Sequence, residues 1–295
     1  MTTVSGFTFV KNGMSLGYPI AESLKSVEPL CDEVVINVCF DDEACAQDDG
    51  TYEYLRDTLN TEKYKFLKSY WKGNKDLGDH IYGAHTNYAL NHCKGKVCQY
   101  IQGDEVLHEK DYPEIEKGFK ELIDRNDLHG LLFHYYHFYG NVDAYKFTRQ
   151  IYKREIRTIK NNIDVSSWKD AQGFRFKNET KLRAKQIPAH IYHYGWARKE
   201  SIMKEKVKVM ATHYHGDDFV AKEEFEYKRI WGVKAFEGTH PKVMGDWVEA
   251  NRNEIDMMSL PRAYHSGDIN LMVTDLLEWL TGYRLGEYKN FKVVK

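Results

Sequence analysis

Residues 97–109, Val-Cys-Gln-Tyr-Ile-Gln-Gly-Asp-Glu-Val-Leu-His-Glu, decide the fold of this 295-residue chain. The apolar run from Val97 to Ile101 is typical of a buried β-strand. The run ends at Gln102-Gly103, and two adjacent carboxylates follow, Asp104 and Glu105. Acids at the carboxyl end of a strand lie where open α/β sheets bind ligands. The segment therefore predicts a ligand-binding strand end, with an ordinary acidic turn as the alternative.

Upstream of this strand, apolar runs alternate with segments of helical periodicity. Strands are predicted at 4–10, 32–40, 65–70 and 97–101, and helices at 19–30, 52–59 and 79–93. This order is typical of a parallel sheet with helices on both faces. A second acidic pair, Asp41-Asp42, follows the second strand. Because parallel strands end at one edge of the sheet, we expect both acidic pairs at one cleft.

The pattern changes after residue 110. Helices are predicted at 112–125, 199–212, 241–251 and 268–280, the last with Asp268 as N-cap, and strands at 128–139, 149–160, 173–176 and 189–194. We therefore predict an α/β, Rossmann-type, mostly parallel sheet flanked by helices. Residues 1–200 are expected to form the domain built around this sheet. Residues 201–295 are expected to form a helical C-terminal extension packed on it, with a peripheral tail from Tyr283.

Composition limits the classes of function. The formal net charge of −2 provides no global basic field for nucleic acid or an anionic membrane. Five cysteines without a Cys-x-x-Cys pair argue against a disulfide framework or a zinc site. The N-terminus does not have the pattern of a signal peptide, and no apolar stretch is long enough to span a bilayer. We expect a cytoplasmic protein, with a peripheral position at the inner face of a membrane as the alternative.

Several segments together resemble the inverting, family-two-like glycosyltransferases of the GT-A fold, and in particular a bacterial and phage branch of that family. The resemblance covers residues 3–200. The segments that carry it are Ser5–Asn12, Cys31–Ile36, Asp49-Gly50-Thr51, Asn87 with Gly95 eight residues later, Asp104 nine residues beyond Gly95, Arg154–Asn161 and His193–Trp196. Asp104 falls where the family has the last Asp of its Asp-x-Asp motif. Gln102 stands in place of the first Asp and brings no charge.

The resemblance implies that residues 1–200 form a GT-A-like nucleotide-sugar-binding and catalytic domain. It also implies an enzyme that moves a single sugar from a nucleotide-diphosphate sugar to an acceptor hydroxyl with inversion, assisted by Mn²⁺ or Mg²⁺. The Arg-Trp motif of processive synthases is not evident. The residues implied in donor binding are Phe9, Asn12, Asp41, Asp42, Asn87, Gln102 and Arg198, and those implied as metal ligands are Asp104, Glu105 and His193. A packed, hydrogen-bonded histidine is the alternative for His193.

The chemistry explains why these residue types are needed. Negative charge develops on the leaving diphosphate, and a divalent cation held by carboxylates stabilises it. The acceptor hydroxyl must lose a proton to a general base on the opposite side of the sugar. We predict Asp170, in a loop beyond the metal strand, as this base, with a solvent-facing loop acid as the alternative. Glu155 and Asp143 are the next candidates.

Three other features of the sequence bear on the site. The run from His134 to Tyr139 is expected to face the core on one side and an acceptor cleft on the other. His213 and His215 have the composition of a metal pair, although the following Gly-Asp-Asp favours a polar loop. The lysine-rich segment 199–208 is expected to be a solvated helix face, and a basic strip for an anionic acceptor is the alternative.

Two rival functions share the predicted fold. A nucleotidyltransferase would need a glycine-rich basic loop after the first strand, whereas Lys11-Asn12-Gly13 offers one lysine and one glycine. A nucleotide-sugar-binding module without activity is favoured by the uncharged Gln102. For the enzyme, a lipid-linked glycan, a surface polysaccharide, a protein and modified DNA all stay open as acceptors, as does the oligomeric state.

Overall fold

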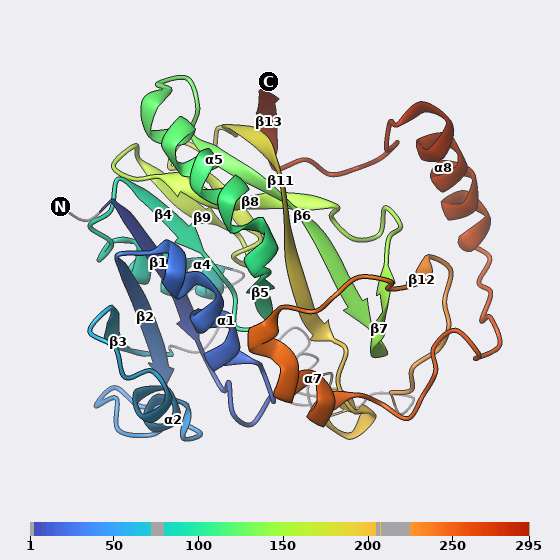
Figure 1. The fold of residues 1–295 in the computed structure, drawn as a ribbon, viewed down its shortest axis with the longest axis horizontal. Helices are drawn as coiled ribbons and strands as arrows, with labels where there is room; N and C mark the ends of the chain where they lie inside the picture. Colours follow the sequence, from blue (N-terminus) through green and yellow to red (C-terminus); the bar gives the residue numbers. More distant parts are fainter. Residues whose placement is uncertain (1–2, 72–79, 205–206, 208–224, 295) are drawn as a thin grey trace.

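The computed structural model describes residues 3–71, 80–204, 207 and 225–294 (Figure 1). Its centre is an eleven-stranded mixed sheet with helices on both faces. This α/β architecture is the predicted one. The helix expected at 199–212 lies largely outside the described residues, and His213 and His215 lie wholly outside them.

The first four strands form the parallel part of the sheet. They are β1 (Val4–Val10), β2 (Glu33–Phe40), β3 (Tyr64–Tyr70) and β4 (Val97–Tyr100), adjacent in the order β3-β2-β1-β4. The connecting helices are α1 (Ile20–Val27) with η1 (Glu28–Leu30), α2 (Thr51–Thr58) and α4 (Ile81–Leu90). All four strands were predicted within one residue of these bounds, because short segments rich in β-branched and aromatic residues between polar breaks are a strong signal.

The rest of the sheet is more irregular than predicted. The strands β6 (Gly130–Tyr139), β8 (Arg154–Lys160) and β11 (Leu182–Trp196) were expected, but β11 extends well beyond the predicted 189–194. Sequence patterns missed β5 (Glu105–Leu107), β7 (Asn141–Lys146) and β9 (Val165–Trp168), which pairs with β10 (Gly173–Phe176). Gly140, with φ +74°, makes the tight turn that folds β7 back on β6. β8 runs antiparallel to both β4 and β6, and β11 runs parallel to β6 and antiparallel to β5.

Apolar side chains cover both faces of the sheet. One core packs α1, α2 and α5 (Tyr112–Asp124) against it, and its members include Leu24, Val27, Ile36, Leu55, Ile115 and Phe119. The opposite core lies under α4 and β10, and its members include Phe7, Ala89, Tyr100 and Phe174. Since strands buried on both faces read as nearly continuous apolar runs, the cover on both sides of the sheet explains the sequence pattern of β2.

The C-terminal part contains the expected helices and two unexpected strands. η4 (Lys242–Met244) and α7 (Gly245–Asn251) fill the segment predicted at 241–251, and α8 (Asp268–Thr281) begins at Asp268, one residue after its N-cap Gly267. β12 (Val233–Ala235) pairs with β7, and β13 (Phe291–Val294) pairs with β11. The tail expected to be peripheral therefore extends the sheet, and Phe291 is buried. None of the described helices has the length and apolar character needed to cross a bilayer.

Candidate functional site

The carboxyl ends of β1 and β2 bring Asn12 and Asp41 together, as the strand pattern predicts. Lys11 Nζ lies 2.6 Å from Asp41 Oδ1 and 2.7 Å from Asn12 Oδ1. Asn12 adopts φ +54°, a left-handed conformation that asparagine tolerates better than most residues. The side chain of Asp41 is 56% exposed, so its second oxygen is accessible to a ligand from solvent. The cation of Lys11 was not predicted, and it makes this edge less acidic than the sequence implied.

Three of the residues implied in donor binding make contacts within the protein. Asp42 Oδ1 accepts hydrogen bonds from the backbone N–H groups of Ala46 and Gln47, at 3.0 and 2.7 Å. Asn87 Oδ1 accepts a hydrogen bond from the backbone N–H of Ser167 at 2.8 Å, which ties α4 to β9. Phe9 packs in an aromatic cluster with Trp71, Tyr82 and His85. These contacts give Asp42 and Asn87 a role in loop and helix positioning.

Arg198 is also placed as a positioning residue. Its side chain is fully buried, and its guanidinium donates to the carbonyl oxygens of Leu16 and Gly195. The guanidinium carbon lies 4.5 Å from the centre of the Tyr18 ring. Arg198 therefore fixes the loop after β1 against the end of β11, instead of presenting its charge to a diphosphate.

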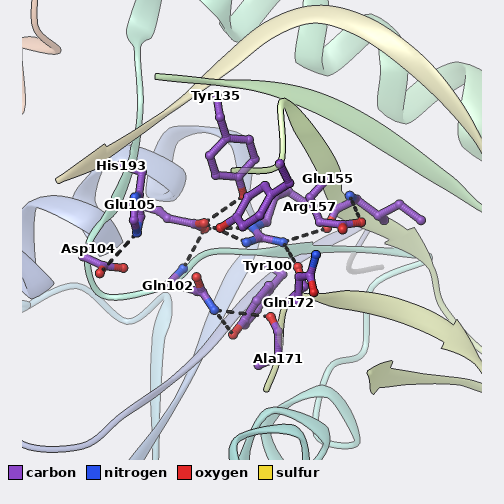
Figure 2. A network of polar contacts seen from close by, with 12 residues as sticks. Tyr100, Gln102, Asp104, Glu105, Tyr135, Glu155, Arg157, Ala171, Gln172 and His193 are labelled. Carbon is purple, nitrogen blue, oxygen red and sulfur yellow. Dashed lines mark hydrogen bonds and ion pairs between the residues drawn. The ribbon is translucent and has the colours of Figure 1, made fainter. Parts of the chain in front are cut away.

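Glu105 lies inside the protein, in a buried ion pair with Arg157 (Figure 2). Arg157 donates from Nη2 to Oε1 at 2.7 Å and from Nε to Oε2 at 2.9 Å, and both side chains are fully buried. The Tyr135 hydroxyl donates to Oε1 at 2.8 Å, and the Gln102 backbone N–H donates to Oε2 at 3.2 Å. Since both oxygens are occupied, the metal-ligand role expected for Glu105 does not fit the structure. The sequence does not distinguish Glu105 from its neighbour Asp104. Successive residues point to opposite faces only in a regular strand, and Asp104 lies in a turn where this rule does not apply.

Glu105→Gln is expected to destabilise the fold by about 3–5 kcal/mol, because it leaves the buried Arg157 without a counter-charge. Urea unfolding followed by circular dichroism measures this change. Glu114→Gln, which removes an exposed partner of Lys117, is the control and should alter stability by less than about 1 kcal/mol. Equal stability of the two variants would contradict the structural role of Glu105.

Asp104 lies in the turn between β4 and β5, next to His193 on β11. Asp104 Oδ2 is 3.4 Å from His193 Nε2, and both side chains are about 15% exposed. His193 Nδ1 lies 3.1 Å from His137 Nδ1, and His137 Nε2 lies 2.8 Å from the carbonyl oxygen of Tyr152. Burial holds the pKa of His137 well below its usual range, so this ring is neutral.

The carbonyl of Tyr152 decides how protons are arranged along this row of groups. A carbonyl only accepts, so His137 Nε2 carries the hydrogen and His137 Nδ1 accepts from the Nδ1–H of His193. The remaining nitrogen of His193, Nε2, faces the carboxylate of Asp104. An imidazole nitrogen and a carboxylate oxygen at this distance share a proton or a cation that lies between or beside them. The pair has the oxygen and imidazole donors that suit a divalent transition metal such as Mn²⁺.

Gly195 makes this approach possible. A Cβ at this position would lie 2.6 Å from Asp104 Oδ2 and 2.9 Å from His193 Nε2. Gly195→Ala is therefore expected to displace the Asp104 carboxylate and lower turnover about 10²-fold, the usual cost of a misplacement near 1 Å. Gly245→Ala is the matched control, because a Cβ at Gly245 meets no atom within 4 Å. A Gly195→Ala enzyme with the control's activity would show that the Asp104–His193 pair is not used.

Gln102 makes contacts that an aspartate could not make. Its Nε2 donates to the carbonyl oxygen of Ala171 at 3.3 Å and to the Tyr100 hydroxyl at 3.4 Å (Figure 2). A carboxylate in this place would face the Ala171 carbonyl with no proton to donate. The described residues contain no cluster of three or more His, Cys, Asp or Glu side chains arranged as a metal site. Any bound cation would therefore take its remaining ligands from water and substrate.

Asp170 lies in the exposed turn between β9 and β10. It lines a cavity of about 480 Å³ together with Gln102, Tyr152, Gln172 and Glu287. The same turn supplies the Ala171 carbonyl that Gln102 binds. The exposed Asp170 thus lines a cavity that reaches Gln102, just beyond the end of β4.

The two other base candidates are placed less favourably. Glu155 is 1% exposed, and its carboxylate accepts a hydrogen bond from the backbone N–H of Ile156 at 2.9 Å. A Cβ on Gly173 would lie 2.6 Å from Glu155 Oε1, so the backbone of β10 covers this carboxylate. Asp143 is on β7 and forms an ion pair with Arg252.

Burial raises the pKa of Glu155 to about 7, which makes a prediction about stability. In the unfolded chain Glu155 ionises near pH 4.5. Between pH 4.5 and 7 the unfolded chain therefore binds fewer protons than the folded chain. The contribution of Glu155 to the free energy of unfolding is therefore fully present below pH 4.5 and is lost as the pH rises through 7. Glu155→Gln should therefore raise the stability at pH 8 by up to about 3 kcal/mol and change it little at pH 4.5. Thermal melting at the two pH values measures the difference, and equal effects at both would contradict it.

Sequence reasoning missed three residues around His193. His137 and Tyr152 set the tautomer of His193, and Lys146 lies directly opposite His137 in the β6–β7 pair, on the same face of the sheet. Burial lowers the pKa of Lys146 to about 8. The only signal in the sequence was the density of histidine and aromatic residues at 133–138.

No protein-family model matches the chain, and no curated protein matches its sequence. Among solved structures, S. aureus TarS 1-349 matches 74% of this chain and 67% of its own, at 11% identity and a TM-score of 0.36. The same protein in complex with UDP-GlcNAc gives a TM-score of 0.37 at 12% identity.

A third structure is similar over a smaller part. The mannosyltransferase PcManGT from Pyrobaculum calidifontis, in complex with GDP-Man and Mn²⁺, matches 47% of this chain and 36% of its own, at 16% identity and a TM-score of 0.30. All of these likenesses lie below the level from which family membership or function is inferred.

Proposed function

We propose that this protein is a glycosyltransferase that moves one sugar from a nucleoside-diphosphate donor to an acceptor hydroxyl, with inversion and with the help of a divalent cation. The observation that carries the proposal is the Asp104–His193 pair at the end of β4, with the tautomer of His193 fixed by His137 and Tyr152. The motif order of residues 3–200 supports the same reaction. We assign the chemistry to residues 1–200, and we propose that residues 201–295 pack on them as an extension.

Asp104 and His193 would hold the cation, and their donor set fits Mn²⁺ or Mg²⁺, with Mn²⁺ favoured by the imidazole. Bound there, the cation would stabilise the charge that develops on the leaving diphosphate. His137 would act through His193, because a metal-bound histidine is oriented by the group that its other ring nitrogen contacts. Glu105 and Arg157 would keep the end of β4 in place beneath the pair.

The donor and the acceptor would approach from different sides of this pair. Asn12 and Asp41 would contact the base or the ribose of the donor, since carboxylate and amide oxygens accept from N–H and O–H groups. The acceptor hydroxyl would enter the cavity at Gln102 and Asp170 and pass its proton to the Asp170 carboxylate. Attack from the side opposite the diphosphate inverts the configuration at the anomeric carbon.

Calorimetric titration with UDP, GDP, CDP and dTDP, each with and without Mn²⁺, tests the proposal. We expect one nucleotide to bind, and Mn²⁺ to tighten its binding. The absence of binding for all four would contradict donor recognition at this edge. Donor hydrolysis assays then separate the rivals: Mn²⁺-dependent release of the diphosphate indicates a transferase, and binding without turnover indicates a module that has lost its chemistry. Formation of a nucleotide sugar from a sugar phosphate and a nucleoside triphosphate would indicate the nucleotidyltransferase.

A further inference from the structure

Helix α8 is attached to the protein through its polar face. Figure 1 shows this helix at the edge of the molecule, on the side away from β1–β3. Thr274, Asp275 and Glu278 point inward, and each is held by a hydrogen bond or ion pair: from Arg149 to Thr274 at 3.1 Å, from Trp231 to Asp275 at 2.8 Å, and from Lys153 and Arg284 to Glu278, both at 2.7 Å. These contacts fix the rotation of the helix about its axis.

The outward face of α8 is apolar. Ile269, Val273, Leu276 and Leu280 are 68, 52, 55 and 63% exposed, and Trp279 is 79% exposed. No charged side chain of α8 is exposed to a comparable extent, since Asp268 is buried and Asp275 and Glu278 are partly buried in the contacts above. This helix reverses the usual arrangement, in which the apolar side of an amphipathic helix faces the core.

The spacing of the exposed residues forms a seam along the helix. Positions 269, 273, 276 and 280 are separated by four, three and four residues, the spacing of the a and d positions in a coiled coil. At 100° per residue these four side chains lie within about 60° of one another, and Leu277 and Trp279 flank them on either side. A narrow stripe of this kind fits between the ridges of another helix.

The exposed apolar area approaches that of a stable interface. A fully exposed aromatic side chain carries about 150–250 Å², so Trp279 and Tyr283, at 79 and 60% exposure, together leave on the order of 300 Å² uncovered. The exposed aliphatic side chains of α8 and Leu285 add to this patch. The largest apolar patches on monomers are about 300–600 Å², whereas a stable interface buries about 800 Å² on each partner.

We propose that this face of α8 binds the same face of α8 in a second copy of the chain, related by a two-fold axis. In such a dimer the patch of one copy packs against the same patch of the other. A charged residue in the patch would then face the same charge in the second copy, so the patch has to be uncharged. The face of α8 meets this condition. A membrane surface fits less well, because membrane-surface helices have a polar face rich in Lys and Arg, whereas that of α8 contains Asp275 and Glu278 and is turned into the protein.

Sedimentation equilibrium of the full chain across a range of concentrations tests the proposal. We expect a dimer, and we expect Leu276→Lys to raise its dissociation constant at least about tenfold, with about 10²-fold for Val273→Lys combined with Leu276→Lys. Val293→Lys places the same charge at an apolar residue of similar exposure on β13, and it should leave the dimer intact. Circular dichroism and thermal melting verify that each variant is folded.

Three results would overturn the proposal. The first is a protein that stays monomeric throughout the range. The second is a dimer that the double variant does not weaken. The third is a monomer that binds phosphatidylcholine vesicles and loses this binding in the double variant, because the occupant of the face would then be lipid. None of these readouts requires enzymatic activity, so the proposal stands or falls separately from the proposed function.

Discussion

Replacing Asp104 with Asn is expected to lower kcat with a nucleotide-sugar donor by about 10²–10³-fold. The loss of the carboxylate removes the only negative charge in the Asp104–His193 pair, and metal stabilisation of a leaving group contributes several kcal/mol to the barrier. The Mn²⁺ dependence of nucleoside-diphosphate binding should weaken at the same time. Calorimetric titration of the nucleotide with and without Mn²⁺ measures this part of the effect.

Asp164→Asn provides the matched control for Asp104→Asn. Asp164 is 85% exposed, and its carboxylate pairs with Lys177 at the surface, at 3.3 Å. The same chemical change there should leave both turnover and metal-assisted binding unaltered. Full activity of Asp104→Asn in metal-free buffer would show that Asp104 is not a metal ligand. A loss of activity with unchanged Mn²⁺ dependence would place Asp104 in some other step.

The parallel half of the sheet was the most predictable part of the fold. β2 is buried along its whole length and its sequence is a nearly continuous apolar run, which is typical of a central parallel strand. β1 and β4 are buried as well, although polar residues interrupt their apolar ones. β5 (Glu-Val-Leu) and β9 (Val-Ser-Ser-Trp) escaped prediction because neither sequence shows a continuous apolar run or a regular alternation. β13 belongs to the sheet only because β11 extends far enough to pair with it, which is a tertiary condition that the local sequence does not contain.

The candidate site was predictable only where geometry follows from topology. Because β1, β2 and β4 are parallel, the strand ends that precede Asn12, Asp41 and Asp104 lie at one edge of the sheet. Whether a carboxylate at this edge faces a cleft or pairs with a buried basic side chain depends on residues far away in the sequence. Glu105 and Asp104 are adjacent, yet Arg157, 52 positions later, draws Glu105 inward while His193 lies beside Asp104. A single sequence offers no rule by which these pairings could be found.

Asp170→Asn should lower turnover by about 10²–10⁴-fold, the usual share of general-base catalysis. Asp170 lies on the rim of the cavity that Gln102 also lines, and Glu155 and Asp143, the other candidates, are respectively covered by Gly173 and paired with Arg252. An asparagine keeps the size of the side chain but cannot take a proton from the acceptor. Steady-state kinetics with saturating donor should therefore show the loss in kcat.

Donor binding distinguishes this role from a structural one. Because the proposed base contacts the acceptor and not the donor, the dissociation constant of the nucleoside diphosphate should change less than about twofold in Asp170→Asn. Asp164→Asn, from the turn that precedes β9, should behave like the wild type in both assays. A variant whose loss lies wholly in nucleotide affinity would contradict the assignment and leave the proton to another group around the cavity.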